Sequence, residues 1–315
     1  MMMPDQQPDV EIRGYLTAFV DLLGLSNRLL EFEKIGQFIG GEIPEDFKKE
    51  AARTAVSAEW LRDSFITFYQ AQTDPQGQLP PGPLSAEQLA IWNRQFPDPP
   101  TIQWFSDCIL VSIPIRSEWP VSFYRSLHSL VLACAMAQIR ALVLKLPARG
   151  GIAIGYGARL NTGEILGAGL AKAYQLESKE ANYPRILIDP ELIDTAKPPS
   201  KPQPDWKERE FEIVWAFWRN CLKLLRRDRD GYWFVDFFNE EIFKLMRDQE
   251  GKMVGILLRL IDEAMTPFTN DEVYPRNATS SGRGHFAKWT WLANYWKESR
   301  GQIVDLLPQT DNSKG

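Results

Sequence analysis

The sequence predicts an α+β protein, in which a mixed sheet is covered by helices over residues 14–195 and a mostly helical extension follows. Three observations lead to this prediction. Short runs rich in β-branched and aromatic residues alternate with longer runs whose apolar residues recur at helical spacing. Two apolar runs near residue 107 are separated by two residues, which is typical of a hairpin. Seven of the eleven tryptophans come after residue 205, in segments with a helical pattern.

The first elements follow in order from these patterns. Residues 14–20 (GYLTAFV) predict a strand that ends at Asp21, and the apolar residues of 22–38 recur at helical spacing. A second helix is expected over residues 44–70. Residues 73–100 are rich in proline and predict an inserted loop with a short helical stretch inside it.

The next segments alternate between strand and helix patterns. They predict a hairpin over 101–114, a helix over 120–142, a strand over 143–155, a helix over 164–181 and a strand over 184–188. Residues 196–205, rich in proline and lysine, predict a linker. The aromatic-rich helical extension then covers residues 206–310. The length of 315 residues is compatible with two domains.

Composition excludes several classes of function. Two histidines and three scattered cysteines, without metal-ligand spacing, build no structural zinc site and no disulfide framework. The formal net charge of −5 argues against general nucleic-acid binding, which needs a basic surface. No segment is long and apolar enough to span a membrane, and the polar, acidic N-terminus is no signal peptide. A cytoplasmic protein is therefore expected.

Asp21 is the first candidate functional residue, because it stands where a strand becomes a helix. A carboxylate there, next to the free N–H groups of a helix start, is suited to hold a metal beside a bound phosphate. A helix cap is the alternative interpretation, and for Asp21 taken alone it is the favoured one.

Asp107 is the second candidate, at the tip of the predicted hairpin. Aspartate is a common turn former, so a purely structural role is again favoured for the residue in isolation. If the first strand lies beside the hairpin, however, Asp21 and Asp107 meet. Two such carboxylates can hold two divalent cations for an in-line phosphoryl reaction.

The segment ARGGIAIGYG (148–157) is the third candidate. Glycines inside a strand often mark the close approach of a ligand or of another backbone, or a bulge. Arg149 at its start has a guanidinium group suited to two phosphate oxygens, although an exposed arginine without such a role is the alternative.

Taken in order, FVDLLGLS, FSDCILVSIPI, ARGGIAIGYG, ILGAGLAKAYQLES and YPRILI resemble the catalytic domain of class III nucleotidyl cyclases. The closest resemblance is to the pyrimidine cyclases of the bacterial Pycsar antiphage system, and it covers residues 14–195. The resemblance implies a ferredoxin-like sandwich that works as a homodimer. It also implies a cytoplasmic enzyme that makes cyclic UMP from UTP, or cyclic CMP from CTP, as a second messenger read by a separate effector.

The resemblance also implies roles for individual residues. Asp21 and Asp107 would hold two Mn²⁺ or Mg²⁺ ions, with the backbone carbonyl of Leu22 as a further ligand. Arg149 would contact the triphosphate. Three further residues would contact the nucleotide: Phe19 lying under it, Gly24 within the phosphate-facing backbone of residues 23–27, and Gln103.

Four positions depart from the pattern of adenylate cyclases. Gln103 and Ala168 stand where those enzymes carry the purine-reading lysine and aspartate. An amide at Gln103 can pair with a pyrimidine edge, although a surface glutamine is an equally good interpretation. Ala171 and Gln175 stand where the family carries its transition-state asparagine and arginine.

Two other hypotheses follow. The absent asparagine and arginine favour a cyclase-like module that binds a nucleotide without turnover. The aromatic-rich extension favours a scaffold whose main task is to bind a partner.

Overall fold

The computed structural model describes residues 10–23, 43, 45–75, 85–105, 107–116, 118, 120–202, 208–248, 251–268 and 280–307. Its strands are β1 (Ile12–Leu22), β2 (Thr101–Phe105), β3 (Cys108–Pro114), β4 (Ala148–Arg159), β5 (Ile165–Gly167), β6 (Ile186–Ile188), β7 (Leu225–Arg227) and β8 (Trp233–Val235). Its α-helices are α2 (Glu45–Thr73), α3 (Ala86–Arg94), α4 (Pro120–Val143), α5 (Ala168–Gln175), α6 (Pro190–Thr195), α7 (Glu208–Lys223), α8 (Glu240–Leu245), α9 (Lys252–Met265) and α10 (Ser280–Val304).

All eight described strands belong to one mixed sheet, in the order β2-β3-β1-β4-β6-β8-β7, and β5 pairs with β4. The central strand β1 is antiparallel to both β3 and β4, and only β4 and β6 run parallel. The predicted α+β class is therefore confirmed. Because β8 pairs with β6, the sheet continues from the first 195 residues into the extension.

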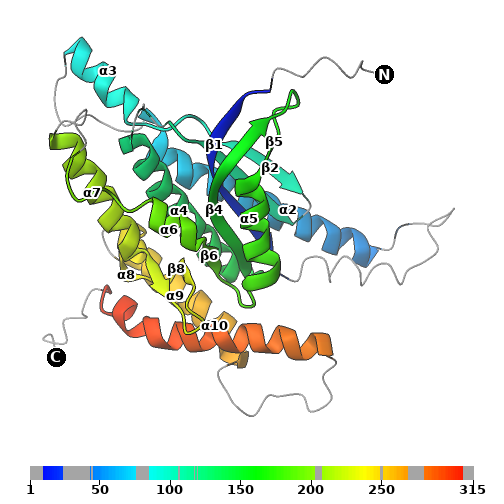
Figure 1. Ribbon diagram of the computed structural model, residues 1–315. Coiled ribbons are helices and arrows are strands. Elements are labelled where there is room, and N and C mark those ends of the chain that lie inside the picture. Colours follow the sequence, from blue (N-terminus) through cyan, green and yellow to red (C-terminus); the bar gives the residue numbers. More distant parts are fainter. Residues whose placement is uncertain are drawn as a thin grey trace, which may run out of the picture.

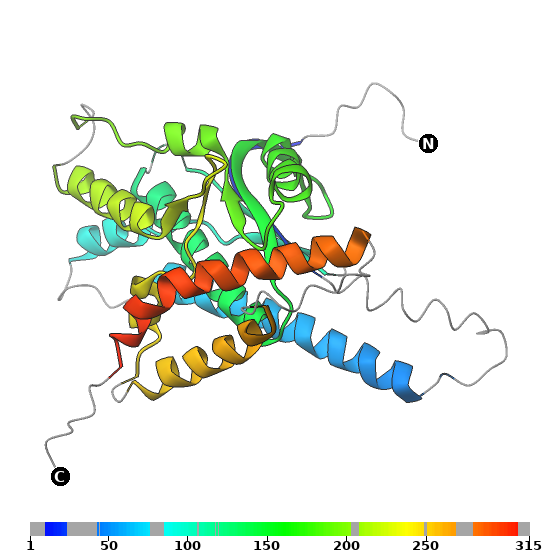
Figure 2. The same ribbon diagram turned by 90° about the horizontal axis from the view of Figure 1, so that it is seen from below.

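Helices cover the sheet on both sides (Figure 1). One face packs against α4, which is almost entirely buried and has α2 and α7 on its other sides. On the opposite face, α5 lies over β4 and β1. Figure 2 shows α10, in orange to red, crossing the middle of the view beside α9.

The side chains of β1 alternate between the two faces of the sheet, so this strand contributes to the hydrophobic cluster on each face. Leu16, Ala18, Val20 and Leu22 join the main core with α2 and α4. Phe19 points to the opposite face and packs with Leu110, Ala153 and Ala173 under α5. Consecutive side chains of a strand point to opposite faces, so the odd-numbered residues of β1, Asp21 included, face α5.

The expectation that no segment is long and apolar enough to span a membrane needs correction, because by length and composition alone α4 qualifies, as the one such helix among the described residues. Its apolar window is 83% buried inside the protein, however. That burial is typical of the core helix of a soluble protein, and the described residues give no other candidate span.

Several predicted elements need correction. The predicted strand over 143–155 begins only at Ala148, because α4 runs to Val143 and Lys145 takes a left-handed φ of 58°. The predicted helix over 164–181 is wrong at its start, where β5 pairs with the end of β4, and residues 176–180 form a π-helix. The helix expected over 22–38 is wrong at Leu22, which belongs to β1, and from residue 24 it lies outside the described residues.

The extension is also less uniform than its sequence pattern predicts. It contains α7, α8, α9 and α10, but the β7–β8 hairpin stands between α7 and α8. Its aromatic residues join the main core together with those of the sheet and α4. The short helix α3 lies inside the proline-rich insertion of residues 73–100, as expected.

Candidate functional site

Asp21, Cys108 and Arg149 form a row across three neighbouring strands. In the register of the sheet, Asp21 of β1 lies opposite Cys108 of β3 on one side and opposite Arg149 of β4 on the other. Residues directly opposite in a ladder project to the same face, so all three side chains lie on the α5 face. The antiparallel pairing thus brings Asp21 beside two residues that are each more than eighty positions later in the chain.

Asp107 joins this row from the hairpin turn. Its backbone carbonyl accepts a hydrogen bond from the N–H of Leu22, at 3.1 Å, which fixes the turn against the end of β1. One ligand atom from each of Asp21, Asp107 and Cys108 lies within 4.8 Å of the others. The predicted meeting of the two aspartates is therefore present in the structure.

The thiol of Cys108 acts here as a hydrogen-bond donor. Sγ donates to Oδ1 of Asp21 at 3.3 Å and lies 3.8 Å from Oδ1 of Asp107. Burial raises the pKa of Cys108 far above its usual value, and the Asp21 carboxylate raises it further. Carboxylate oxygens suit Mg²⁺ and Mn²⁺, which prefer oxygen to sulfur ligands. The donor set therefore fits hard divalent cations held by Asp21 and Asp107.

Arg149 is paired with two carboxylates. Its Nε lies 3.5 Å from Oδ2 of Asp21 and 2.6 Å from Oε1 of Glu177. Glu177 belongs to the π-helix after α5, and its side chain is only 4% exposed. Such single-turn π-helices often occur at functional sites, because the extra residue redirects a side chain. Here it places a buried carboxylate over Arg149.

Charge balance at the site involves α10 as well. Burial raises the pKa of Glu177, although the charge of Arg149 opposes that shift. Burial also lowers the pKa of Lys288 on α10, as does Arg149, whereas Asp21 and Glu177 act to raise it. The extension therefore contributes a cation to the same electrostatic environment as the row across the sheet.

The glycines of β4 allow α5 to lie directly on the strand. A Cβ at Gly151 would come within 2.5 Å of the carbonyl oxygen of Ala173, and one at Gly155 within 2.4 Å of the Gly169 nitrogen. Of the alternatives that the sequence left open, the close approach of another backbone is the one observed. The approach brings the start of the π-helix over Arg149.

The other predicted site residues are placed as follows. Phe19 is buried between the sheet and α5, with its ring edge-to-face on Tyr174 at 5.5 Å. The side-chain oxygen of Gln103 accepts a hydrogen bond from the N–H of Ile165, at 3.5 Å. Leu22 ends β1 beside Asp107. Of the phosphate-facing segment predicted over residues 23–27, the structure describes Leu23, whereas Gly24 and residues 25–27 lie outside the described residues.

Sequence reasoning did not find Cys108, Glu177 or Lys288 as members of the site. For Glu177 a signal exists: in the α-helix predicted over 164–181 it would share the face of Ala173, four residues earlier. An acidic residue at a buried helical position needs a partner, and Arg149 supplies it. Lys288 has no comparable signal, because only the tertiary packing of α10 brings it to the sheet.

Comparison with known proteins does not identify a relative. No family model matches the chain, and no curated protein and no solved structure is significantly similar to it.

Proposed function

We propose that this chain is a cytoplasmic pyrimidine nucleotide cyclase that converts UTP to 3′,5′-cyclic UMP and pyrophosphate, with CTP as the next substrate. The observation that carries the proposal is the convergence of Asp21 and Asp107 beside Arg149, on one face of the sheet. The antiparallel order β2-β3-β1-β4 supports it as well, because a ferredoxin-like sandwich has this strand order.

In the proposed reaction the ribose 3′-oxygen attacks the α-phosphorus, the 3′-hydroxyl loses its proton and pyrophosphate leaves. Bound Mn²⁺ or Mg²⁺ would supply Lewis-acid activation of the hydroxyl and neutralise phosphate charge. Asp21 and Asp107, with the carbonyl of Leu22, would hold these ions. Arg149 would exchange its contacts with Asp21 and Glu177 for the triphosphate oxygens, which carry more negative charge than either carboxylate.

A second copy of the chain is part of the proposal. Ile12, Tyr156 and Leu166 are large apolar residues with 71%, 77% and 63% exposure, respectively. The register of the sheet places them at the same end of β1, β4 and β5. Exposed apolar residues gathered at one sheet end are typical of a protein–protein interface. Replacing Tyr156 and Leu166 together by serine should convert a dimer into a monomer, as measured by light scattering.

The experiment that tests the activity is incubation of the purified chain with Mn²⁺ and each of the four common nucleoside triphosphates. Chromatography should show a cyclic pyrimidine nucleotide and pyrophosphate, and the Asp107→Asn variant should form neither. Asp194→Asn, an exposed aspartate on α6, is the matched control and should keep the activity of the unmodified chain. Failure of all four triphosphates to give a cyclic product would refute the proposal.

A nucleotide-binding module without turnover is the second candidate. One observation favours it: Ala171 and Gln175 are exposed on α5 and present no asparagine or arginine for a transition state. The same incubation separates the two candidates. Saturable triphosphate binding without any product would favour the binding module.

A further inference from the structure

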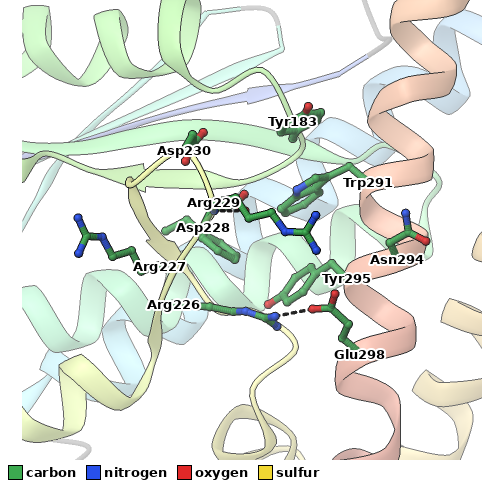
Figure 3. Close-up of a pocket in the computed structure, with 11 residues that line it drawn as sticks. Tyr183, Arg226, Arg227, Asp228, Arg229, Asp230, Trp291, Asn294, Tyr295 and Glu298 are labelled. Carbon is green, nitrogen blue, oxygen red and sulfur yellow. Dashed lines mark hydrogen bonds and ion pairs between the residues drawn. The ribbon is translucent and has the colours of Figure 1, made fainter.

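A cavity lies between the β7–β8 hairpin and α10 (Figure 3). Its volume is about 410 Å³, which is within the usual range of small-molecule sites. None of its lining residues belongs to the candidate site described above. It combines an aromatic wall with a cluster of arginines at the hairpin turn.

The aromatic wall comes from α10 and from the segment before β6. The rings of Trp291 and Tyr183 are stacked, with an interplanar angle of 7° and centroids 5.4 Å apart. Tyr295 continues the wall, and its ring is held in place because the hydroxyl accepts from the Phe238 N–H at 3.1 Å and donates to Asp236. Tyr183 and Trp291 cover one face of each other, and the aromatic surface that the wall still presents to the cavity suits the flat face of a nucleobase.

The turn that faces this wall is held from inside the protein. Arg185, which is fully buried, pairs with both Asp228 and Asp230. The turn is closed by a hydrogen bond from the Gly231 N–H to the Asp228 carbonyl, at 3.0 Å, with Gly231 at a φ of 90°. Because both aspartates are tied to one buried arginine, the position of the residue between them is fixed.

That residue is Arg229. Figure 3 shows its side chain reaching from the turn toward Trp291 and Asn294, whereas Arg227 points away from α10. Arg226 already pairs with Glu298 across the cavity, at 2.5 Å, and Arg185 is neutralised by its two aspartates. Among the described residues, no carboxylate pairs with Arg229, so its positive charge in the cavity remains available.

We propose that this cavity binds a free nucleoside monophosphate, with the base against the Trp291 wall and the phosphate on Arg229. Guanidinium groups recognise phosphate through paired hydrogen bonds, and the amide of Asn294 offers both a donor and an acceptor to a base edge. A nucleotide at the end of a nucleic-acid strand has the same chemistry. The formal net charge of −5 disfavours such a strand, so the free nucleotide is assigned. The assignment does not depend on the proposed cyclase activity.

Calorimetric titration of the full chain in buffer with a chelator tests the proposal. The probes are UMP, CMP, AMP and GMP, inorganic phosphate and a short oligothymidylate. At least one monophosphate should bind saturably with one site per chain, and more tightly than phosphate or the oligothymidylate. Lack of saturable binding by all four monophosphates overturns the proposal, as does equal or tighter binding of phosphate or the oligothymidylate.

Single substitutions test whether the monophosphate binds in this cavity. Arg229→Gln should weaken the binding of that monophosphate at least about tenfold, the effect expected for loss of a charge-assisted contact. Arg259→Gln is the matched control, because Arg259 is exposed on α9, is not among the residues that line the cavity, and pairs with Glu263 at 3.9 Å. Asp107→Asn, in the candidate site, should leave the affinity unchanged. Equal weakening by Arg229→Gln and Arg259→Gln overturns the proposal, as does loss of binding in Asp107→Asn.

Discussion

Asp21 and Arg149 face each other across the β1–β4 ladder, with Oδ2 and Nε 3.5 Å apart, on the side of the sheet that α5 covers. Neither residue is unusual in its own segment. The pairing register alone makes them neighbours, and it adds Cys108 from the other side of β1.

The first prediction concerns metal binding. Asp21→Asn and Asp107→Asn should each weaken Mn²⁺ binding at least about tenfold, because each removes one of the two carboxylates that converge there. Cys108→Ser should change the affinity little, since Mn²⁺ prefers carboxylate oxygen to sulfur ligands. Electron paramagnetic resonance of free Mn²⁺ measures all three, with Asp194→Asn as control. Strong weakening by Cys108→Ser together with none by Asp107→Asn would contradict this assignment of ligands.

The second prediction concerns the buried carboxylate above Arg149. Glu177→Gln should lower the free energy of unfolding by about 1–3 kcal/mol, because Arg149 loses a buried charged partner 2.6 Å away. Glu263→Gln is the control, since its pair with Arg259 is exposed and should contribute close to nothing. Urea denaturation measures both variants. Equal effects of the two substitutions would mean that the Arg149–Glu177 pair does not stabilise the fold.

The third prediction concerns the contact between β4 and α5. Gly151→Ala and Gly155→Ala should each destabilise the protein by about 1–3 kcal/mol, because the added methyl group meets the backbone of α5. In contrast, Gly301→Ala in α10 meets nothing within 4 Å and should stabilise the protein by up to about 1 kcal/mol. Thermal denaturation of the three variants gives the comparison. Stabilisation by all three would show that α5 does not depend on the glycines.

The fourth prediction concerns pH. Burial, and then the charge of Arg125, lower the pKa of His128 to about 4, and the ring of Phe217 packs against it. In the unfolded chain this histidine takes up a proton near its ordinary pKa of about 6.5. The unfolded state therefore binds more protons between these two values, and His128 makes the protein less stable as the pH falls through that window.

Replacing His128 by glutamine isolates this contribution. The free energy of unfolding of the unmodified chain should fall more steeply, by up to about 1.4 kcal/mol per pH unit between pH 6 and 4, than that of His128→Gln. Chemical denaturation at a series of pH values measures the difference. The two curves should run parallel above pH 7, where His128 is neutral in both states. Parallel curves below pH 6 as well would show that the histidine titrates normally in the folded protein.

Local sequence patterns correctly predicted those helices and strands in which burial of one face imposes a regular spacing of apolar residues. The strand at 14–20, the hairpin at 101–114 and the buried helix at 120–142 are all present. The helix over 164–181 was wrong at its start because β5 forms only through pairing with the far end of β4. The β7–β8 hairpin was missed because its two strands have three residues each, too few for a periodic signal.

The part of the candidate site that could be predicted from the sequence consists of residues that stand at the ends of strands. Asp21 and Asp107 stand at the end of a strand and at a hairpin turn, and their meeting follows once β1 lies beside the hairpin. Glu177 and Lys288 were not predictable in this way. The position of Glu177 depends on a π-helix, and that of Lys288 depends on the packing of a helix more than a hundred residues later.

The pairing of β6 with β8 has a consequence for synthesis on the ribosome. Ile188 ends β6, and Val235, which ends β8, is 47 positions later (235 − 188). At ordinary translation rates the free edge of β6 therefore stays without its partner for about 2–9 s after it emerges. An open edge of apolar strand is prone to pair with other chains. A nascent chain whose translation stalls between Ile188 and Val235 should aggregate. A chain that stalls after the β7–β8 hairpin has emerged should not.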